Sequence, residues 1–181
     1  INILNSILLI DKNHIFQSLD ELFKLQKHIG SQNLSNSNPS LDLANFLSHI
    51  PLIYFPYGLQ SSAIRFKASI QENAKTHAII EDIVEASHNG IVAWEKPSII
   101  RPILLRGDKD FIKTKERFEI IKEFFIKNNI EFKEINSISG NILTKLITLT
   151  YLLDYTTIYR AILSEIDPSP VSSIDFIKSK I

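Results

Sequence analysis

Short apolar segments alternate with longer amphipathic segments along most of this chain, and this alternation constrains the fold more than any other feature. The segments that favour strands are "PLIYF" (51–55), "ILLRGD" (103–108) and "IEFKEI" (130–135). Helical periodicity follows each of them, from about residue 62, over 110–128 and over 141–153. Strands that alternate with helices are typical of βαβ units. We therefore predict an α/β fold, with a parallel sheet flanked by helices on both faces.

The remaining segments complete this outline. Residues 1–29 carry apolar positions at helical spacing and predict two amphipathic helices, or one helix broken near "DKNH". The polar segment 30–40 predicts a loop, and Asn38 or Ser40 is the expected cap of a helix over "LDLANFLSHI". Residues 77–90 have a mixed pattern, and "GIVAW" (90–94) predicts a strand.

The helix that begins near residue 62 has two distinct sides. Arg65, Ser69 and Glu72 share one stripe, whereas Ala63, Phe66, Ile70 and Ala74 share the opposite, apolar one. We therefore expect Glu72 to point away from the core. The helix over 141–153 is apolar nearly all round, so we expect it to be buried on several sides or to lie in a subunit interface.

The composition limits the classes of function. The 181 residues are 44% hydrophobic, and 20 basic side chains balance 20 acidic ones, which favours one compact domain and disfavours a nucleic-acid or anionic-membrane partner. There is no cysteine, and the five histidines lack the spacing of metal ligands, so we predict no metal site and no cofactor. No apolar run reaches the ~20 residues of a membrane span. We therefore expect a soluble, cytoplasmic protein with no membrane partner. Methionine is absent even at position 1, so we also expect the sequence to be a fragment of a longer chain.

Two short motifs invite functional interpretations. Ser139-Gly140-Asn141 precedes a helix and resembles a phosphate-cradling loop, because glycine lets backbone amides approach an anion. So short a pattern is also that of a turn with an asparagine cap, and we favour the turn. Arg106-Gly107-Asp108 is interpreted as a turn after a strand.

Glu72 and His88 lie sixteen positions apart, and taken singly each has an ordinary explanation. A helical glutamate is usually a solvated surface residue, and His88 falls in a predicted loop. Chemically, however, moving a proton between adjacent sugar carbons needs one carboxylate as a base and a titratable group to open the ring. Glutamate and histidine are the right two types for this reaction.

Several motifs resemble a known family in the expected order. "IQENAK", "SHNGIVAW" and "LLDYTTIYRAILSEIDPSPVSSIDFIKSKI" are similar to the carboxyl-terminal half of the archaeal-type bifunctional phosphoglucose/phosphomannose isomerases, and "NPSLDLANFLSHIPLIYF" matches the entry into that half. The family motifs are asparagine-glutamate-asparagine-alanine-lysine and asparagine-histidine-asparagine-glutamate-isoleucine, followed by an aspartate-tyrosine pair near an aspartate-proline-threonine-proline turn. The resemblance covers about residues 38–181, and it implies a helical connector over 1–37 and an absent amino-terminal subdomain.

The resemblance implies a sugar-isomerase (SIS) fold, with flavodoxin-like subdomains, and a homodimer with active sites shared between subunits. By that resemblance Glu72 is the base that moves a proton between C2 and C1 through a cis-enediolate, without metal. His88 helps to open the sugar ring across the subunit interface, and Lys178, or Lys180 in a shifted register, is the lysine near the substrate. The implied substrates are glucose 6-phosphate and mannose 6-phosphate, interconverted with fructose 6-phosphate. Arg65 and Lys67 receive no role.

The chain also departs from the family pattern. Gln71 and Ser87 replace asparagines, Gly90 replaces a glutamate and Ala93 replaces a glycine. The serine-rich phosphate loop of the family's first subdomain has no counterpart upstream of residue 50. Two alternatives therefore stay open beside the isomerase: a sugar-phosphate-binding or dimerisation module that lost catalysis, and an interaction protein that uses the apolar helix over 141–153.

Overall fold

The computed structural model describes residues 11–35 and 37–181, and its central feature is a parallel sheet of four strands. In spatial order the strands are β2 (Ile79–Asp82), β1 (Pro51–Phe55), β3 (Arg101–Arg106) and β4 (Lys133–Asn136). Every neighbouring pair is parallel. The chain winds outward from β1 to β2 and, in the other direction, from β3 to β4. The direction of winding therefore reverses between β1 and β3.

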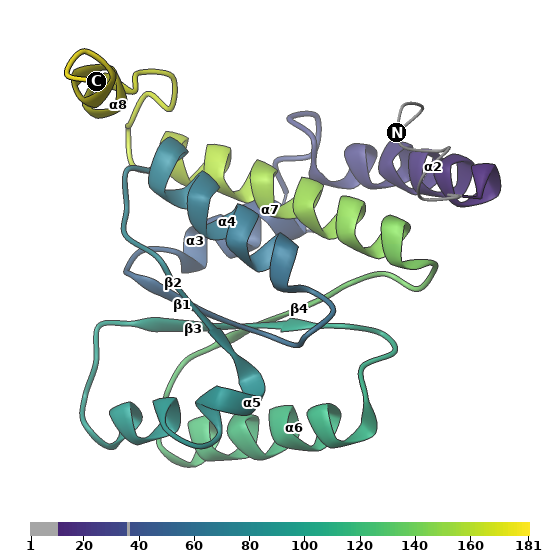
Figure 1. Cartoon of the computed structure of the whole chain (residues 1–181), viewed down its shortest axis with the longest axis vertical. Coiled ribbons are helices and arrows are strands. Elements are labelled where there is room, and N and C mark those ends of the chain that lie inside the picture. Colours follow the sequence, from purple (N-terminus) through teal and green to yellow (C-terminus); the bar gives the residue numbers. More distant parts are fainter. Residues whose placement is uncertain (1–10, 36) are drawn as a thin grey trace.

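Helices cover both faces of this sheet (Figure 1). One face carries α3 (Pro39–Phe46), α4 (Gln60–Asn73) and α7 (Ile142–Leu163), with α2 (Lys12–Ile29) packed along α7. The other face carries α5 (Ile83–Ala86), the 3-10 helix η1 (Gly90–Glu95) and α6 (Ile112–Lys127). The last helix, α8 (Ser172–Lys178), projects from the body of the chain. The predicted α/β fold is confirmed.

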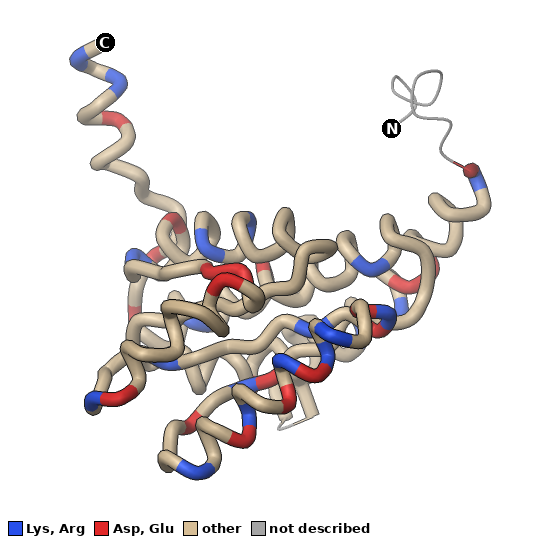
Figure 2. The backbone as a smooth tube through the Cα atoms, turned by 60° about the horizontal axis from the view of Figure 1, so that its bottom comes forward, with Lys and Arg blue, Asp and Glu red and all other residues tan. Residues whose placement is uncertain are grey.

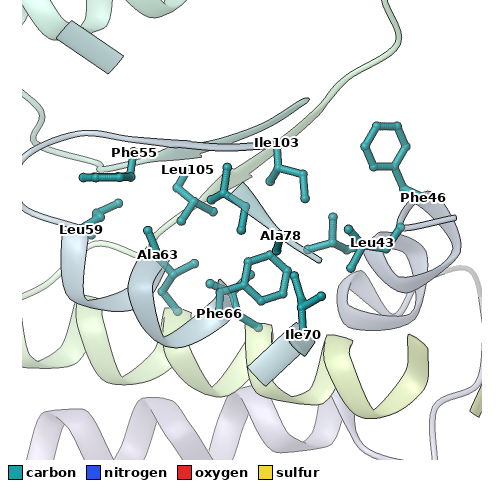
Figure 3. Packing of buried hydrophobic residues seen from close by; sticks show 14 residues of the cluster. Leu43, Phe46, Phe55, Leu59, Ala63, Phe66, Ile70, Ala78, Ile103 and Leu105 are labelled. Carbon is teal, nitrogen blue, oxygen red and sulfur yellow. The ribbon is translucent and has the colours of Figure 1, made fainter. Parts of the chain in front are cut away.

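The central strands supply side chains to two separate cores. Ile53 and Phe55 of β1 face α3, α4 and α7, where Phe66 of α4 is fully buried (Figure 3). Leu52 and Tyr54 point to the opposite face and pack with residues of α5, η1 and α6. All five residues of β1 are buried, which explains why its sequence is continuously apolar rather than alternating.

The two distinctive helices behave as their patterns predict. On α4, Ala63, Phe66 and Ile70 are buried against the sheet, whereas Glu72 is exposed. Helix α7 packs against α2, α3 and α4, so its predicted burial on several sides is confirmed. It continues to Leu163, ten residues beyond the predicted end at 153.

Asparagine side chains begin both α3 and α7. Asn38 accepts hydrogen bonds from the backbone N–H groups of Ser40 and Leu41, at 3.0 and 3.1 Å, so Asn38 rather than Ser40 is the cap of α3. Asn141 accepts from the N–H of Thr144 at 3.0 Å. The preceding Gly140 has φ +144°, a conformation that L side chains rarely adopt. The favoured interpretation of residues 139–141, a turn with an asparagine cap, is confirmed.

The amino-terminal part of the predicted connector lies outside the described residues, and the remainder packs on α7. Helix α2 begins after Asp11, whose carboxylate accepts from the N–H of Asn13 at 2.9 Å. The Ser18 and Thr144 hydroxyls lie 2.9 Å apart. Among residues 11–35 and 37–181, no helix is long and apolar enough to cross a membrane.

The predicted strand over "GIVAW" is wrong, since these residues form the helix η1. The indole N–H of Trp94 donates a buried hydrogen bond of 2.8 Å to the Tyr54 hydroxyl, which holds η1 across the face of β1. β1 already pairs with β2 and β3, so η1 cannot join it edge to edge. The strand in this region is instead β2, which the mixed pattern of 77–90 did not reveal because "IIED" is short, partly exposed and ends in two acidic residues.

Replacing Trp94 with phenylalanine tests this anchor. Trp94→Phe leaves the buried Tyr54 hydroxyl without its donor, so the free energy of unfolding, measured by urea denaturation, should fall by about 1–3 kcal/mol. In a double-mutant cycle with Tyr54→Phe, the double variant should lose less than the sum of the single losses, since both polar groups then disappear together. Strictly additive losses would show that the hydrogen bond does not hold η1 in place.

Candidate active site

Glu72 stands beside a cavity at the carboxyl end of α4. The glutamate occupies the last turn of the helix and its side chain is exposed. The cavity has a volume of about 400 Å³. One side consists of Ala68, Gln71, Glu72 and Lys75, and the other consists of residues 170–174 from the end of the chain. The predicted base thus faces a space that two distant segments of the sequence build together.

Lys75 joins these two segments. Its ammonium donates to the backbone carbonyl of Glu72 at 2.6 Å, and to those of Pro168 and Pro170 at 3.3 and 2.6 Å. Sequence reasoning did not single out Lys75. The motif "IQENAK" contains it and the turn "DPSP" contains its acceptors, but Lys75 and Pro170 are 95 positions apart and no local pattern pairs them.

Polar side chains on α4 bind it to α7. The Asp154 carboxylate accepts from Arg65 at 3.2 and 3.3 Å and from the Ser69 hydroxyl at 2.7 Å. The hydrogen bond to Asp154 raises the pKa of Arg65 above its ordinary value. Asn73, next to Glu72, donates its amide N–H to the Thr157 hydroxyl at 2.8 Å. These contacts fix the end of α4 that carries Glu72.

His88 lies elsewhere in the same chain. It follows α5, and its backbone N–H donates to the Glu85 carbonyl at 2.9 Å while its side chain is exposed. Helices α4 and α5 pack on opposite faces of the sheet (Figure 1). The structure therefore separates Glu72 and His88 within one chain.

Lys178 is the last residue of α8, the helix that projects from the body of the chain (Figure 2), and its side chain is exposed. Lys180, the alternative to it, has its ammonium 5.7 Å from the centre of the Phe176 ring. Neither lysine lines the cavity beside Glu72.

The positions that depart from the family pattern lie in different local surroundings. Gln71 lines the cavity, and the Ser87 hydroxyl donates back to the Ile83 carbonyl of α5 at 2.7 Å. At Gly90, an added Cβ would meet the carboxylate of Glu81, so the missing side chain leaves room for that group. Burial raises the pKa of Glu81 above its ordinary value. Ala93 is exposed on η1.

The predicted site residues line neither a second cavity nor a metal site in the described part of the chain. A second cavity of about 400 Å³ lies between η1 and the end of α6, but Glu72, His88 and Lys178 do not line it. Within the part of the chain that the structure describes, no group of three or more histidine, aspartate or glutamate side chains is arranged to hold a metal ion.

Comparison with known proteins identifies the family to which this fold belongs. Residues 36–181 match the model of the bacterial phospho-glucose isomerase C-terminal SIS domain. The chain belongs to this family. The SIS domain is 33% identical over 138 residues to the bifunctional phosphoglucose/phosphomannose isomerase of Caldicellulosiruptor bescii, a match that covers 73% of this chain and 40% of the relative.

A second relative, from Aquifex aeolicus, has the same name and is 25% identical over 166 residues, covering 90% of this chain and 52% of its own length. The chain thus spans about half the length of the curated relatives it matches.

Solved structures show the same fold at low sequence identity. A glucose-6-phosphate isomerase like protein from Thermus thermophilus has a TM-score of 0.67 at 18% identity, over 85% of this chain and 52% of that one. A putative sugar-phosphate isomerase from Listeria monocytogenes has a TM-score of 0.61 at 9% identity, over 91% of this chain and 98% of that one. At these identities the likeness establishes the SIS fold and nothing finer.

The raised pKa of Glu81 predicts a pH-dependent stability. A carboxyl whose pKa is raised in the folded state stabilises the fold at low pH, and this contribution is lost as the pH rises through the raised value. Glu81→Gln, which stays neutral, should therefore raise the melting temperature at pH 7, and the gain should vanish below pH 4.5, the ordinary pKa.

The measurement is calorimetry of the wild type and the variant across this pH range. Glu123→Gln, at an exposed position on α6, is the matched control and should show no such gain. A Glu81→Gln gain of equal size at every pH would contradict the assignment to ionisation.

Proposed function

We propose that this SIS domain is part of an aldose–ketose isomerase that interconverts glucose 6-phosphate or mannose 6-phosphate with fructose 6-phosphate, without a metal ion. The observation that carries the proposal is the placement of Glu72 at a cavity of about 400 Å³, within the size range of small-molecule sites. The names of the relatives support the same reaction. Because the chain spans about half of their length, the activity is proposed for the full-length protein.

The chemistry that we assign to Glu72 is proton transfer between neighbouring carbons. The carboxylate takes the proton from C2 of the open-chain aldose, the C–H electron pair forms the C1–C2 double bond, and the C1=O π pair moves to O1, which gives a cis-enediolate. The C1–C2 π pair then takes the proton back from the carboxyl at C1, while the proton of O2 passes to O1 and the C2=O bond of the ketose forms. A carboxylate fixed on a helix end can serve both carbons, since they are adjacent. The contacts between α4 and α7, such as Asn73 with Thr157, support this role because they hold the end of the helix in place.

We assign ring opening to His88 of the partner subunit in a homodimer. The separation of Glu72 and His88 on opposite faces of the sheet supports a site shared between subunits, because one chain alone does not unite them. Lys178 is the proposed lysine near the substrate. We prefer it to Lys180, whose ammonium already lies over the Phe176 ring.

A second candidate function is a sugar-phosphate-binding or dimerisation module without catalysis. The observations that favour it are the changed motif positions Gln71, Ser87 and Gly90, which flank the proposed catalytic pair. Calorimetric titration with each hexose 6-phosphate, beside a coupled assay of the full-length protein, separates the two candidates. Binding without turnover would support the module.

Removing the base tests the isomerase directly. Glu72→Gln should lower kcat by about 10²–10⁴-fold in a coupled assay of fructose 6-phosphate formation, because general base catalysis contributes that much. The side chain is exposed, so the melting temperature should not change. Glu123→Gln is a matched control and should retain full activity. A Glu72→Gln variant with wild-type kcat would refute the mechanism.

Mixing two inactive variants tests the shared site. In a heterodimer of Glu72→Gln and His88→Gln subunits, one of the two shared sites carries both substitutions and the other is intact. Random reassociation at equal concentrations should thus restore about a quarter of the wild-type activity, as half of the dimers are mixed and each has one working site. If both residues of a site came from the same subunit, no activity would return on mixing.

A further inference from the structure

The backbone of Lys75 is unusual for a residue with a side chain. Lys75 follows Ala74, the C-cap of α4, and has φ +53°, in the left-handed region. Glycine is the usual residue at this position after a helix, because it adopts that conformation without steric cost. A residue other than glycine in a disfavoured conformation persists where the surrounding structure holds it, and such positions cluster at functional sites.

The side chain of Lys75 supplies the compensating contacts. A lysine ammonium has three N–H donors and no acceptor. Here there are three acceptors, the carbonyls of Glu72, Pro168 and Pro170, at 2.6, 3.3 and 2.6 Å. Since each donor has a protein acceptor, Lys75 has none left for a ligand. Its contribution to the site is therefore structural rather than catalytic.

The turn that receives these hydrogen bonds is itself restrained. Pro168 and Pro170 have fixed φ angles, and the carboxylate of Asp167 accepts from the N–H of Ser169 at 2.9 Å. The two proline carbonyls therefore face Lys75 from a stiff segment. We call residues 171–181, which follow it, the carboxyl-terminal arm; they comprise α8 and the proposed Lys178.

We propose that Lys75 is a positioning residue that holds the carboxyl-terminal arm against the end of α4 and so completes the cavity beside Glu72. Residues 170–174 form one side of that cavity, and Lys75 binds Pro170, the first of them. The geometric part of this proposal stands on the contacts alone. Its consequence for catalysis rests on the proposed function.

Three variants separate the side chain from the backbone. Lys75→Gly removes the ammonium and suits the left-handed backbone, so it should fold at least as well as the wild type. Lys75→Arg keeps a cationic donor and should restore part of the contacts. Asn129→Gly is the matched control, because Asn129 has φ +55° after α6 and does not contact the arm.

The position of the arm is measured with two spin labels in the full-length protein. Residues 1–181 contain no cysteine, so labels at Ile64→Cys on α4 and Ser179→Cys on the arm meet no competing thiol from this chain. The wild type, Lys75→Arg and Asn129→Gly should each give one narrow distance distribution. Lys75→Gly should lose it and give a broad one. An unchanged narrow distribution in Lys75→Gly would overturn the proposal.

Kinetics test the consequence for the site. Lys75→Gly should raise KM and lower kcat/KM by up to about 10²-fold, because residues 170–174 would no longer be held in position beside the substrate. Lys75→Arg should recover much of the lost kcat/KM. Asn129→Gly should match the wild type. Unchanged kinetics with a released arm would overturn the positioning role. If the wild type itself has no isomerase activity, the proposed function fails, and the distance measurement alone decides whether Lys75 holds the arm.

Discussion

The burial of β1 and β3 on both faces is the constraint on which the rest of this structure depends. Their side chains alternate between two cores, with Ile53 and Ile103 on one side and Tyr54 and Leu104 on the other. Helices must therefore cover each face, since an uncovered face would expose apolar side chains to water. The chain meets this requirement by sending α4 to one face and α5 to the other, so Glu72 and His88 are separated by the packing that stabilises the fold.

The same packing determines how firmly Glu72 is held. A carboxylate at a helix end is only as well placed as the helix, and α4 contacts α7 through both apolar and polar side chains. Ser69 and Arg65 share the Asp154 carboxylate, and Asn73 bonds Thr157 one residue from the proposed base. The stripe of Arg65, Ser69 and Glu72 is thus partly an interhelical contact, and Ser69 is buried, whereas the sequence predicts only that Glu72 points away from the core.

Local sequence predicted the parts of the fold that local physics decides. The run at 51–55 is buried on both faces, and the apolar stripe of α4 meets the sheet, so composition and periodicity were sufficient there. They were not sufficient for "GIVAW", because a short apolar run does not distinguish a strand from a 3-10 turn. The hydrogen bond that holds these residues as a 3-10 helix joins Trp94 to Tyr54, forty positions away.

The proposed site likewise combines features that local sequence predicts with features that distant contacts determine. The residue types of Glu72 and His88 and their family motifs could be read from the sequence, but the wall opposite Glu72 could not, since it depends on Lys75 reaching a turn at the other end of the chain. Contacts between residues so far apart in the sequence produce no periodic pattern that could predict them. Sequence reasoning therefore identified candidate chemical groups and missed Lys75, the residue that connects the end of α4 to the turn before the carboxyl-terminal arm.

The charge distribution places a further demand on the proposed reaction. Acidic and basic residues balance in number and are interspersed along the backbone (Figure 2), so the net charge provides no general attraction for a phosphorylated sugar. Among the described residues that line the cavity, Lys75 is the one cation, and its three donors already have carbonyl acceptors. Ser172 and Ser173 offer hydroxyls without charge. Under the proposed function, the phosphate therefore needs hydrogen-bond donors other than Lys75, and the family resemblance assigns them to the serine-rich loop of the first subdomain.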